Sequence, residues 1–205
     1  MDKKKGKQNY IDEFLKETGQ LARQIDRQAI EKIITLLEKI RRQKGRLFFL
    51  GVGGGAANAS HAVNDFRKIA GFEAYTPTDN VSELTALIND EGWLDVFSSW
   101  LKESRLSSKD AIFILSIGGG NRQKKISENL IKAIDLARKR KAKVLGIVAR
   151  EDGYTAQKAD ACVVIPCPSP ERLTPHGEAW QALLLHLIVS HPRLKAKEMK
   201  WEATK

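Results

Sequence analysis

The chain has 205 residues, of which 42% are hydrophobic, and its 35 Lys and Arg against 25 Asp and Glu give a formal net charge of +10. This length suits one domain of ordinary size with a hydrophobic core of its own. No stretch approaches the roughly 20 consecutive apolar residues of a membrane span, and the lysine-rich start lacks the apolar region of a signal peptide, so we expect a cytoplasmic protein with no membrane partner.

The excess of basic residues does not by itself indicate nucleic acid. Much of it lies at the two ends of the chain, within residues 3–7 and 195–205, and on helix faces such as 138–143. Aromatic residues are not interleaved with these charges, as single-strand binding requires, and no helix-turn-helix or other reader motif is visible. Solvated termini and attraction of anionic metabolites explain the charge, so a nucleic-acid partner is not expected.

The leading segment reads as helical. Apolar residues recur at helical spacing through residues 10–44, with a polar break near 26–28, which predicts one long helix or two consecutive helices ahead of any strand. An apolar helix face needs a surface to pack on, and in this position another subunit is a good candidate. We therefore expect residues 1–44 to form a helical segment that packs in the oligomer.

From residue 45 onward short apolar runs alternate with helical patterns. The runs predict strands over residues 46–52, 72–75, 111–116, 143–148 and 161–165. The patterns between them predict helices over residues 57–69, 81–87, 94–101, 125–140, 155–159 and 175–190. Strands that alternate with helices imply right-handed crossovers and a parallel sheet covered on both faces. We expect this α/β domain to occupy residues 45–192, with a basic tail over 193–205.

Two glycine-rich runs carry the strongest functional signal. GVGGG at 51–55 and SIGGGN at 116–121 each follow an apolar run and precede a helical pattern, a layout that presents backbone N–H groups and a helix N-terminus to an anion, most often a phosphate. Neither run matches a nucleotide fingerprint, since GxxxxGK[ST] is absent and Ala56 breaks the last position of GxGxxG. The alternative is a tight turn without a ligand. Because both runs lie at strand carboxyl ends, they should face one crevice.

Two pairs of polar residues on helices add a candidate metal and proton-transfer site. His61 and Asp65 are four residues apart and share a helix face, and Glu178 and His186 are eight apart on the last helix. Two imidazoles and two carboxylates form a suitable donor set for Zn²⁺. The alternative for each histidine is a core or interface residue with satisfied hydrogen bonds, and His176 and His191 fit cap or surface roles.

Several segments together resemble a known family. GVGGG followed by ASHAVND, the segment ALINDEGWLDVF, the strand running into SIGGGN, and the closing helix GEAWQALLLHLIV resemble the sugar isomerase (SIS) domain, and within it the phosphoheptose isomerase family. The resemblance implies an SIS-type three-layer sandwich with a five-stranded parallel sheet, a homotetramer with active sites between subunits, and zinc as cofactor. It implies conversion of D-sedoheptulose 7-phosphate to D-glycero-D-manno-heptose 7-phosphate, for the heptose of bacterial surface polysaccharides.

The resemblance also implies roles for individual residues. The metal-site positions fall on His61, Asp65, Glu178 and His186, and the catalytic acid and base on Asp65 and His186, without a decision on which is the base. Such a pair can move a proton between C1 and C2 through an enediol. The residues implied to contact the sugar phosphate are Val52, Gly53, Gly54, Gly55, Asn89, Asp90, Ser116, Gly118, Gly119, Gly120, Asn121, Ser127 and Glu178.

The chain also departs from the family at its site. Val52 stands where the family usually has Asn, Gly55 where it has Ser, Asp65 where it has Glu, and Glu178 where it has Gln. The second turn, SIGGGNRQKKIS, is longer and more basic than the usual STSGNS, which would shift phosphate binding towards backbone N–H groups. The departures fit the same reaction, a different sugar phosphate, or a non-catalytic sugar-phosphate-binding or replication-initiator-binding relative.

Overall fold

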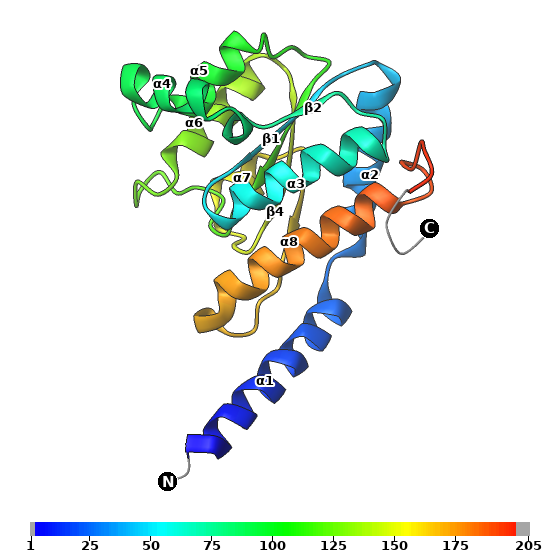
Figure 1. Cartoon of the computed structure of the whole chain (residues 1–205), viewed down its shortest axis with the longest axis vertical. Coiled ribbons are helices and arrows are strands. Elements are labelled where there is room, and N and C mark those ends of the chain that lie inside the picture. Colours follow the sequence, from blue (N-terminus) through cyan, green and yellow to red (C-terminus); the bar gives the residue numbers. More distant parts are fainter. Residues whose placement is uncertain (1–2, 200–205) are drawn as a thin grey trace.

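The computed structural model describes residues 3–199, with side chains from residue 9 onward, and its centre is a five-stranded parallel sheet (Figure 1). The strands lie in the order β2-β1-β3-β4-β5. Their bounds are β1 Leu47–Gly51, β2 Ala74–Tyr75, β3 Ala111–Leu115, β4 Lys143–Val148 and β5 Ala161–Val164. Every predicted strand is present, and each begins or ends within two residues of the expected position.

Helices cover both faces of the sheet, as the alternation of strands and helices predicts (Figure 1). Phe49 and Phe113 point to the face covered by α2, α3 and α8, whereas Phe48 and Ile112 point to the face covered by α5 and α6. No helix within residues 3–199 combines the length and apolar character needed to cross a bilayer. The helices are α1 Lys3–Gln24, α2 Arg27–Arg42, α3 Gly54–Lys68, α4 Val81–Glu91, α5 Val96–Glu103, α6 Glu128–Lys139, α7 Tyr154–Lys158 and α8 Leu173–Ser190, with single 3₁₀ turns at Pro77–Asp79 and Pro170–Arg172.

The leading segment divides into two helices at the predicted polar break. Asp26 caps α2 by accepting hydrogen bonds from the backbone N–H groups of Gln28 and Ala29, which stops α1 and starts a new helix. The apolar face of α2 is buried against the sheet of its own chain through Ile30, Ile33, Ile34, Leu37 and Ile40. This differs from the expectation that all of residues 1–44 pack in the oligomer, since α2 already has its partner. Only α1, which projects from the body, keeps that expected role (Figure 1).

The predicted basic tail begins later than residue 193. Leu194 is fully buried, and Arg193 forms ion pairs with Glu31 and Glu38 of α2. Arg41 in turn donates hydrogen bonds to the backbone carbonyls of Arg193 and Leu194. Residues 193 and 194 therefore belong to the packed body, because their polar backbone groups are satisfied by α2. Lys200 and Lys205 lie outside the described residues.

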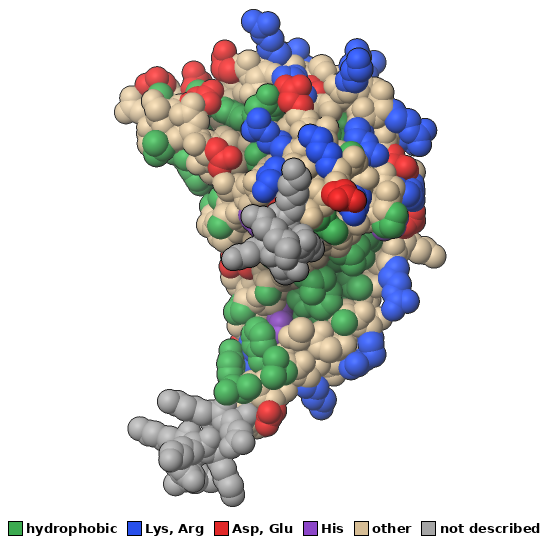
Figure 2. Space-filling model, turned by 45° about the vertical axis from the view of Figure 1, so that its right-hand side comes forward, with side chains coloured by type: hydrophobic (Ala, Val, Ile, Leu, Met, Phe, Trp, Pro, Cys, Tyr) green, Lys and Arg blue, Asp and Glu red, His purple; other side chains and the backbone are tan. Residues whose placement is uncertain are grey.

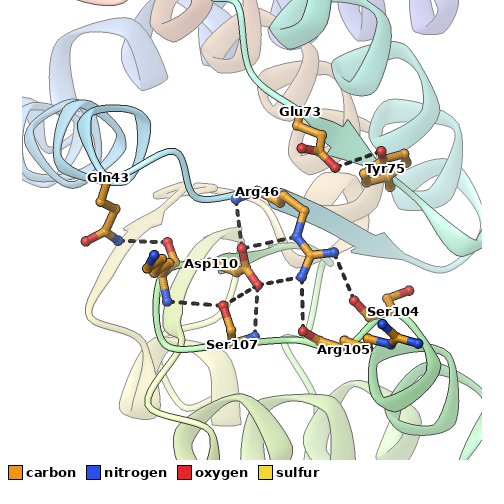
Figure 3. Close-up of polar contacts among 9 residues, drawn as sticks. Gln43, Arg46, Glu73, Tyr75, Ser104, Arg105, Ser107 and Asp110 are labelled. Carbon is orange, nitrogen blue, oxygen red and sulfur yellow. Dashed lines mark hydrogen bonds and ion pairs between the residues drawn. The ribbon is translucent and has the colours of Figure 1, made fainter.

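A buried ion pair fixes the amino edge of the sheet, where the strands begin (Figure 3). Asp110 is 2% exposed and accepts hydrogen bonds from the Arg46 guanidinium, the Arg46 backbone N–H and the Ser107 N–H and hydroxyl. The guanidinium also donates to the backbone carbonyls of Ser104 and Arg105. Burial works to raise the pKa of Asp110, but the hydrogen bonds from Arg46 and Ser107 outweigh it and hold the pKa below its usual 3.8.

The first prediction concerns this pair. Asp110→Asn should lower the free energy of unfolding at neutral pH by about 3 kcal/mol, because it leaves the Arg46 guanidinium without its charge partner. Since the folded pKa lies below the unfolded one, the carboxylate stabilises the fold above its usual pKa, and this contribution is lost as pH falls through the folded value. Urea unfolding should therefore show a difference between the two proteins that shrinks as the pH falls below the usual pKa of 3.8 towards the lower folded value. Asp12→Asn, at an exposed position on α1, serves as control, and an equal loss in both variants would contradict the prediction.

Candidate functional site

The two glycine turns meet where the strand order reverses. From β1 the chain goes to β2 on one side and to β3 on the other, so the crevice outside the carboxyl ends of β1 and β3 is the point where ligands bind in such sheets. The last residues of the two strands, Gly51 and Leu115, are register partners. A β-carbon at Gly55 would lie 2.3 Å from the carbonyl oxygen of Leu115. The first turn therefore packs directly on the end of β3, as one shared crevice requires.

The first turn has the strand, glycine turn, helix layout that the sequence predicts. Gly53, with φ of 60°, precedes the first residue of α3. A β-carbon there would have open space, so the conformation and not crowding favours glycine at this position. Gly54 is crowded instead, because a β-carbon would lie 2.3 Å from the carboxyl carbon of Glu178. The Glu178 side chain thus lies across the first turn of α3.

The second turn is built differently from the expectation. A short hairpin, in which Asn121 and Ile126 exchange backbone hydrogen bonds, separates the glycines from α6. The Ser116 hydroxyl accepts a hydrogen bond from the N–H of Gly119, and Ser127 precedes α6 in a left-handed conformation. The predicted helix start at 125 was wrong, because the basic residues after Asn121 form this hairpin. A polar cavity of about 380 Å³ lies beside it, lined by Gly120, Asn121, Arg122, Gln123, Asp152, Tyr154 and Gln157.

Two helices bring the predicted histidines together. α3 and α8 lie side by side and run in the same direction, so that Glu178 meets Gly54, Gln181 meets Asn58 and His186 meets His61 (Figure 1). Asn58 fixes this register, because its side-chain amide donates to the backbone carbonyl of Glu178 and to the side-chain oxygen of Gln181. Gln181 is fully buried and donates to the carbonyl of Ile147 in β4.

The resulting cluster consists of His61, Asp65 and His186. The Nε2 atoms of the two histidines are 3.3 Å apart, and the Oδ2 atom of Asp65 lies 3.3 Å from His61 Nε2 and 3.5 Å from His186 Nδ1. Asn64 donates to the other oxygen of Asp65 and so orients the carboxylate. The side chains of His61 and His186 are 49% and 45% exposed, whereas that of Asp65 is 10% exposed. The cluster therefore opens to the surface over a buried carboxylate.

The donor chemistry of this cluster fits a metal ion. Its three candidate ligand atoms lie within 4.8 Å of one another, and two imidazoles with one carboxylate form a donor set that suits Zn²⁺ and leaves a coordination position open. Glu178 does not belong to this group, because its carboxylate lies against Gly54, two helical turns before the histidines. The four-residue ligand set implied by the family resemblance is thus reduced to three in this arrangement.

The remaining predicted site residues lie in different places. Val52 is exposed beside Gly53, and Ser116 and Gly118 lie at the end of β3 on the same crevice. Asn89 and Asp90 occupy the last turns of α4, where the Asn89 amide donates to the Asp90 carboxylate. Figure 1 shows α4 well apart from α3 and α8. The structure therefore does not bring these two residues to the histidines of the same chain.

Three polar residues of this region were missed as site residues, although Asn64 and Gln181 lie within the segments ASHAVND and GEAWQALLLHLIV that carry the resemblance. Asn58, Asn64 and Gln181 set the helix register and orient Asp65. The available signal was position alone: Asn58 and Asn64 share α3 with His61, and Gln181 shares α8 with His186. Which side chains these amides would contact depends on how the two helices pack, and that packing is not visible in the sequence.

His176 has a larger role than the predicted cap. It is 1% exposed, stacks on Phe14 with ring centres 4.2 Å apart, and its Nε2 lies 2.8 Å from Glu17 of α1. Arg172 donates two hydrogen bonds to the same carboxylate. The hydrogen bond from Arg172, with a further contribution from His176, lowers the pKa of Glu17 to about 2 although burial opposes the shift. This contact fastens α1 to the start of α8.

The comparisons with known proteins agree with this architecture. The SIS domain family matches residues 9–149 of the chain. The phosphoheptose isomerase of Helicobacter pylori (strain ATCC 700392 / 26695) is 25% identical over 86% of this chain and 90% of that protein, and that of Sulfurimonas denitrificans is 30% identical over 78% of each. The structure of phosphoheptose isomerase from Neisseria gonorrhoeae is 22% identical and matches with a TM-score of 0.75 over 91% of this chain and 96% of that one. The likeness confirms the predicted three-layer fold.

The second prediction tests the metal site. Calorimetric titration with Zn²⁺ should show one site per chain, and His61→Gln, Asp65→Asn and His186→Gln should each weaken binding at least about tenfold by removing a ligand. His191→Gln is the control, because His191 lies outside the group. Glu178→Gln should change the affinity less than these three. A loss as large as theirs would restore the four-ligand set, and unchanged affinity in all three ligand variants would contradict a metal site here.

Proposed function

The chain belongs to the SIS domain family, and on this premise we propose that it is a sugar-phosphate isomerase that converts D-sedoheptulose 7-phosphate to D-glycero-D-manno-heptose 7-phosphate. The single observation that carries the proposal is the cluster of His61, Asp65 and His186 beside the glycine crevice. A sugar-phosphate-binding module needs contacts to the phosphate, but it needs no acid and base. The identity of the substrate is inferred from the similarity to the phosphoheptose isomerases named above. The product would supply heptose for bacterial surface polysaccharide.

The spacing of the two parts suits a long substrate. His61 lies seven residues beyond Gly54 on α3, which corresponds to about 10 Å at the rise of an α-helix. A seven-carbon sugar with its carbonyl at one end and its phosphate at the other has a comparable length when extended. We place the phosphate at the glycine crevice, towards the backbone N–H groups of the two turns, and C1 and C2 at the histidines.

The reaction moves one proton between C1 and C2, and a second proton between the oxygens on these two carbons. The Asp65 carboxylate is held by Asn64 and lies within 3.5 Å of His186 Nδ1, so one of the pair can take the carbon-bound proton while the other protonates oxygen. The enediol then receives a proton on C2 while its C1 hydroxyl returns a proton to the group that had protonated the oxygen, which leaves the C1 aldehyde and restores both side chains. In the alternative arrangement, in which His61, Asp65 and His186 hold a metal ion, these side chains act as ligands instead, and the ion would polarise the carbonyl and stabilise negative charge on the enediolate.

The half-exposed histidines also support the proposal that a second copy of the chain completes the site. Leu183 and Leu187 are 44% and 40% exposed and lie on the same face of α8 as His186. They line an apolar groove of about 420 Å³ between α2 and α8, and Figure 2 shows hydrophobic side chains gathered over this part of the surface. The projecting α1 carries exposed Ile11 and Leu15. We propose that α1 of one copy covers this groove of another within a homotetramer, which would exclude water from the histidines.

The third prediction concerns turnover. His186→Gln and Asp65→Asn should each lower kcat for sedoheptulose 7-phosphate by about 10²-fold or more, the usual scale for a positioned proton-transfer group, with the assembly intact. Conversion can be followed by NMR of the sugar. Lys68→Gln, on the exposed end of α3, is the control and should be near neutral.

Two results would contradict this proposal, one concerning the catalytic residues and one concerning the isomerase activity. If the unaltered protein converts the substrate and His186→Gln does so equally well, the catalytic assignment fails. If the unaltered protein converts no heptose or related ketose phosphate but binds one, the non-catalytic binding reading replaces the isomerase.

The fourth prediction concerns the assembly. Leu183→Asp with Leu187→Asp should shift the light-scattering mass from a tetramer towards smaller species and lower turnover together with it, because charges would replace the apolar groove. Lys68→Asp, on the exposed end of α3, should leave the mass unchanged. A mass of 22.9 kDa for the unaltered chain at micromolar concentration would exclude the intersubunit site.

A further inference from the structure

Three helices that end at the amino edge of the sheet finish in the same unusual way. α2, α5 and α6 are followed by Lys44, Arg105 and Lys141, whose φ angles are 56°, 52° and 60°. The backbone N–H of the residue after each donates to the carbonyl five positions earlier, at 2.9, 3.0 and 2.9 Å for Gly45 to Ile40, Leu106 to Leu101 and Ala142 to Ala137. This is the Schellman motif, in which the left-handed position is usually glycine.

A side chain in the left-handed conformation costs of order 1 kcal/mol at each place. Elsewhere the chain uses glycine where φ is positive at a helix end, as at Gly92 after α4, where φ is 82°. Attraction between a cation and the helix dipole does not require the strained position, because α2 already carries Arg41 and Arg42 in its last turn and α6 carries Arg138 and Lys139. The three cationic residues therefore lower the stability of the fold by a conformational cost that glycine would not have.

The three turns form one rigid surface. They precede β1, β3 and β4, which are neighbours in the sheet and so lie about 5 Å apart. The Arg46 guanidinium donates to the carbonyls of Ser104 and Arg105, and the Gln43 amide donates to the carbonyl of Lys109 (Figure 3). The backbone N–H of Lys143 donates to the carbonyl of Asp110. The buried Arg46–Asp110 pair thus locks the turns that carry the cations.

Positive charge dominates this surface. We define the amino-edge cluster as the exposed residues Lys44, Arg105, Lys109, Lys139, Arg140 and Lys141. Within the described part of the chain, none of these six side chains forms an ion pair. Glu73 and Glu103 are the exposed carboxylates of the adjoining turns. Figure 2 shows Lys and Arg side chains concentrated on the part of the molecule away from α1.

We propose that the amino-edge cluster binds the phosphate backbone of duplex nucleic acid without reading its sequence. Cations carried by fixed turns along one edge supply the electrostatic, sequence-independent part of such binding. Large exposed apolar and aromatic side chains lie elsewhere on the described surface, for example Trp93, Ile126 and Leu187. Tyr75, 39% exposed, is the large ring of the described surface that lies close to this edge, beside Arg46 (Figure 3). A single ring is too little to anchor the edge in a bilayer or to stack a run of unpaired bases.

The test replaces residues at strained backbone positions by glycine, so that charge is removed without destabilising the fold. In the triple variant Lys44→Gly, Arg105→Gly, Lys141→Gly, each glycine fits its left-handed position, so the melting temperature should stay equal or rise while three charges are lost. The control is Lys16→Gln, Arg23→Gln, Lys124→Gln, which removes three exposed cations that lie on α1 and on the hairpin after β3, away from the amino edge. Fluorescence anisotropy with a labelled duplex of random sequence is measured across about 50 to 200 mM NaCl.

The expected result is a clear separation of the two variants. The glycine variant should lose at least about tenfold in affinity at the lowest salt, and the slope of log affinity against log salt should become shallower by about 3, one for each lost phosphate contact. The control should keep the parent slope. The proposal is overturned if the parent does not bind duplex at the lowest salt, if both variants behave alike, or if polyglutamate or phosphatidylserine vesicles bind the parent more tightly than duplex does.

Discussion

The close approach of α3 and α8 is the constraint on which the rest of the site depends. It is possible because the first turn of α3 carries glycines: a β-carbon at Gly54 would lie 2.3 Å from the carboxyl carbon of Glu178, and one at Gly55 would lie 2.3 Å from the carbonyl oxygen of Leu115. With these side chains absent, Asn58 can bridge to Glu178 and Gln181. The helices then run in the same direction and in a register that sets His61 against His186. The glycine run is therefore a packing device as well as a candidate phosphate contact.

The same constraint separates two ends of a binding path. Glu178 lies at the crevice, across the helix N-terminus, and the histidines lie about two turns further along α3. A carboxylate already occupies the position where the positive end of the α3 dipole would attract an anion. The second turn, with its basic hairpin and the polar cavity beside Arg122, offers the less crowded anion environment. The basic second run thus offsets the negative charge that Glu178 places at the first run.

The two edges of the sheet have different physical characters. At the carboxyl edge the turns leave the ends of β1 and β3 accessible, and ligand chemistry can be assembled there. At the amino edge the buried Arg46–Asp110 pair closes the structure and ties three turns together. A parallel sheet separates these roles because every strand starts at one edge and ends at the other. Changes to the amino edge can therefore alter stability and surface charge without touching the candidate site.

The sequence by itself determined the elements and the sheet, whereas the tertiary structure decided the contacts. Apolar runs such as 111–116 and the helix break at Asp26 depend on residues that are close together in the sequence. The strands, the helices and the sheet covered on both faces could therefore be predicted. Spacing also placed His61 with Asp65 and pointed to His186. It could not exclude Glu178 from that group, find Asn58 and Gln181, or show that α2 is buried in its own chain and that His176 holds α1. Those facts follow from how helices far apart in the sequence pack against one another. Such contacts produce no periodic pattern in a single sequence.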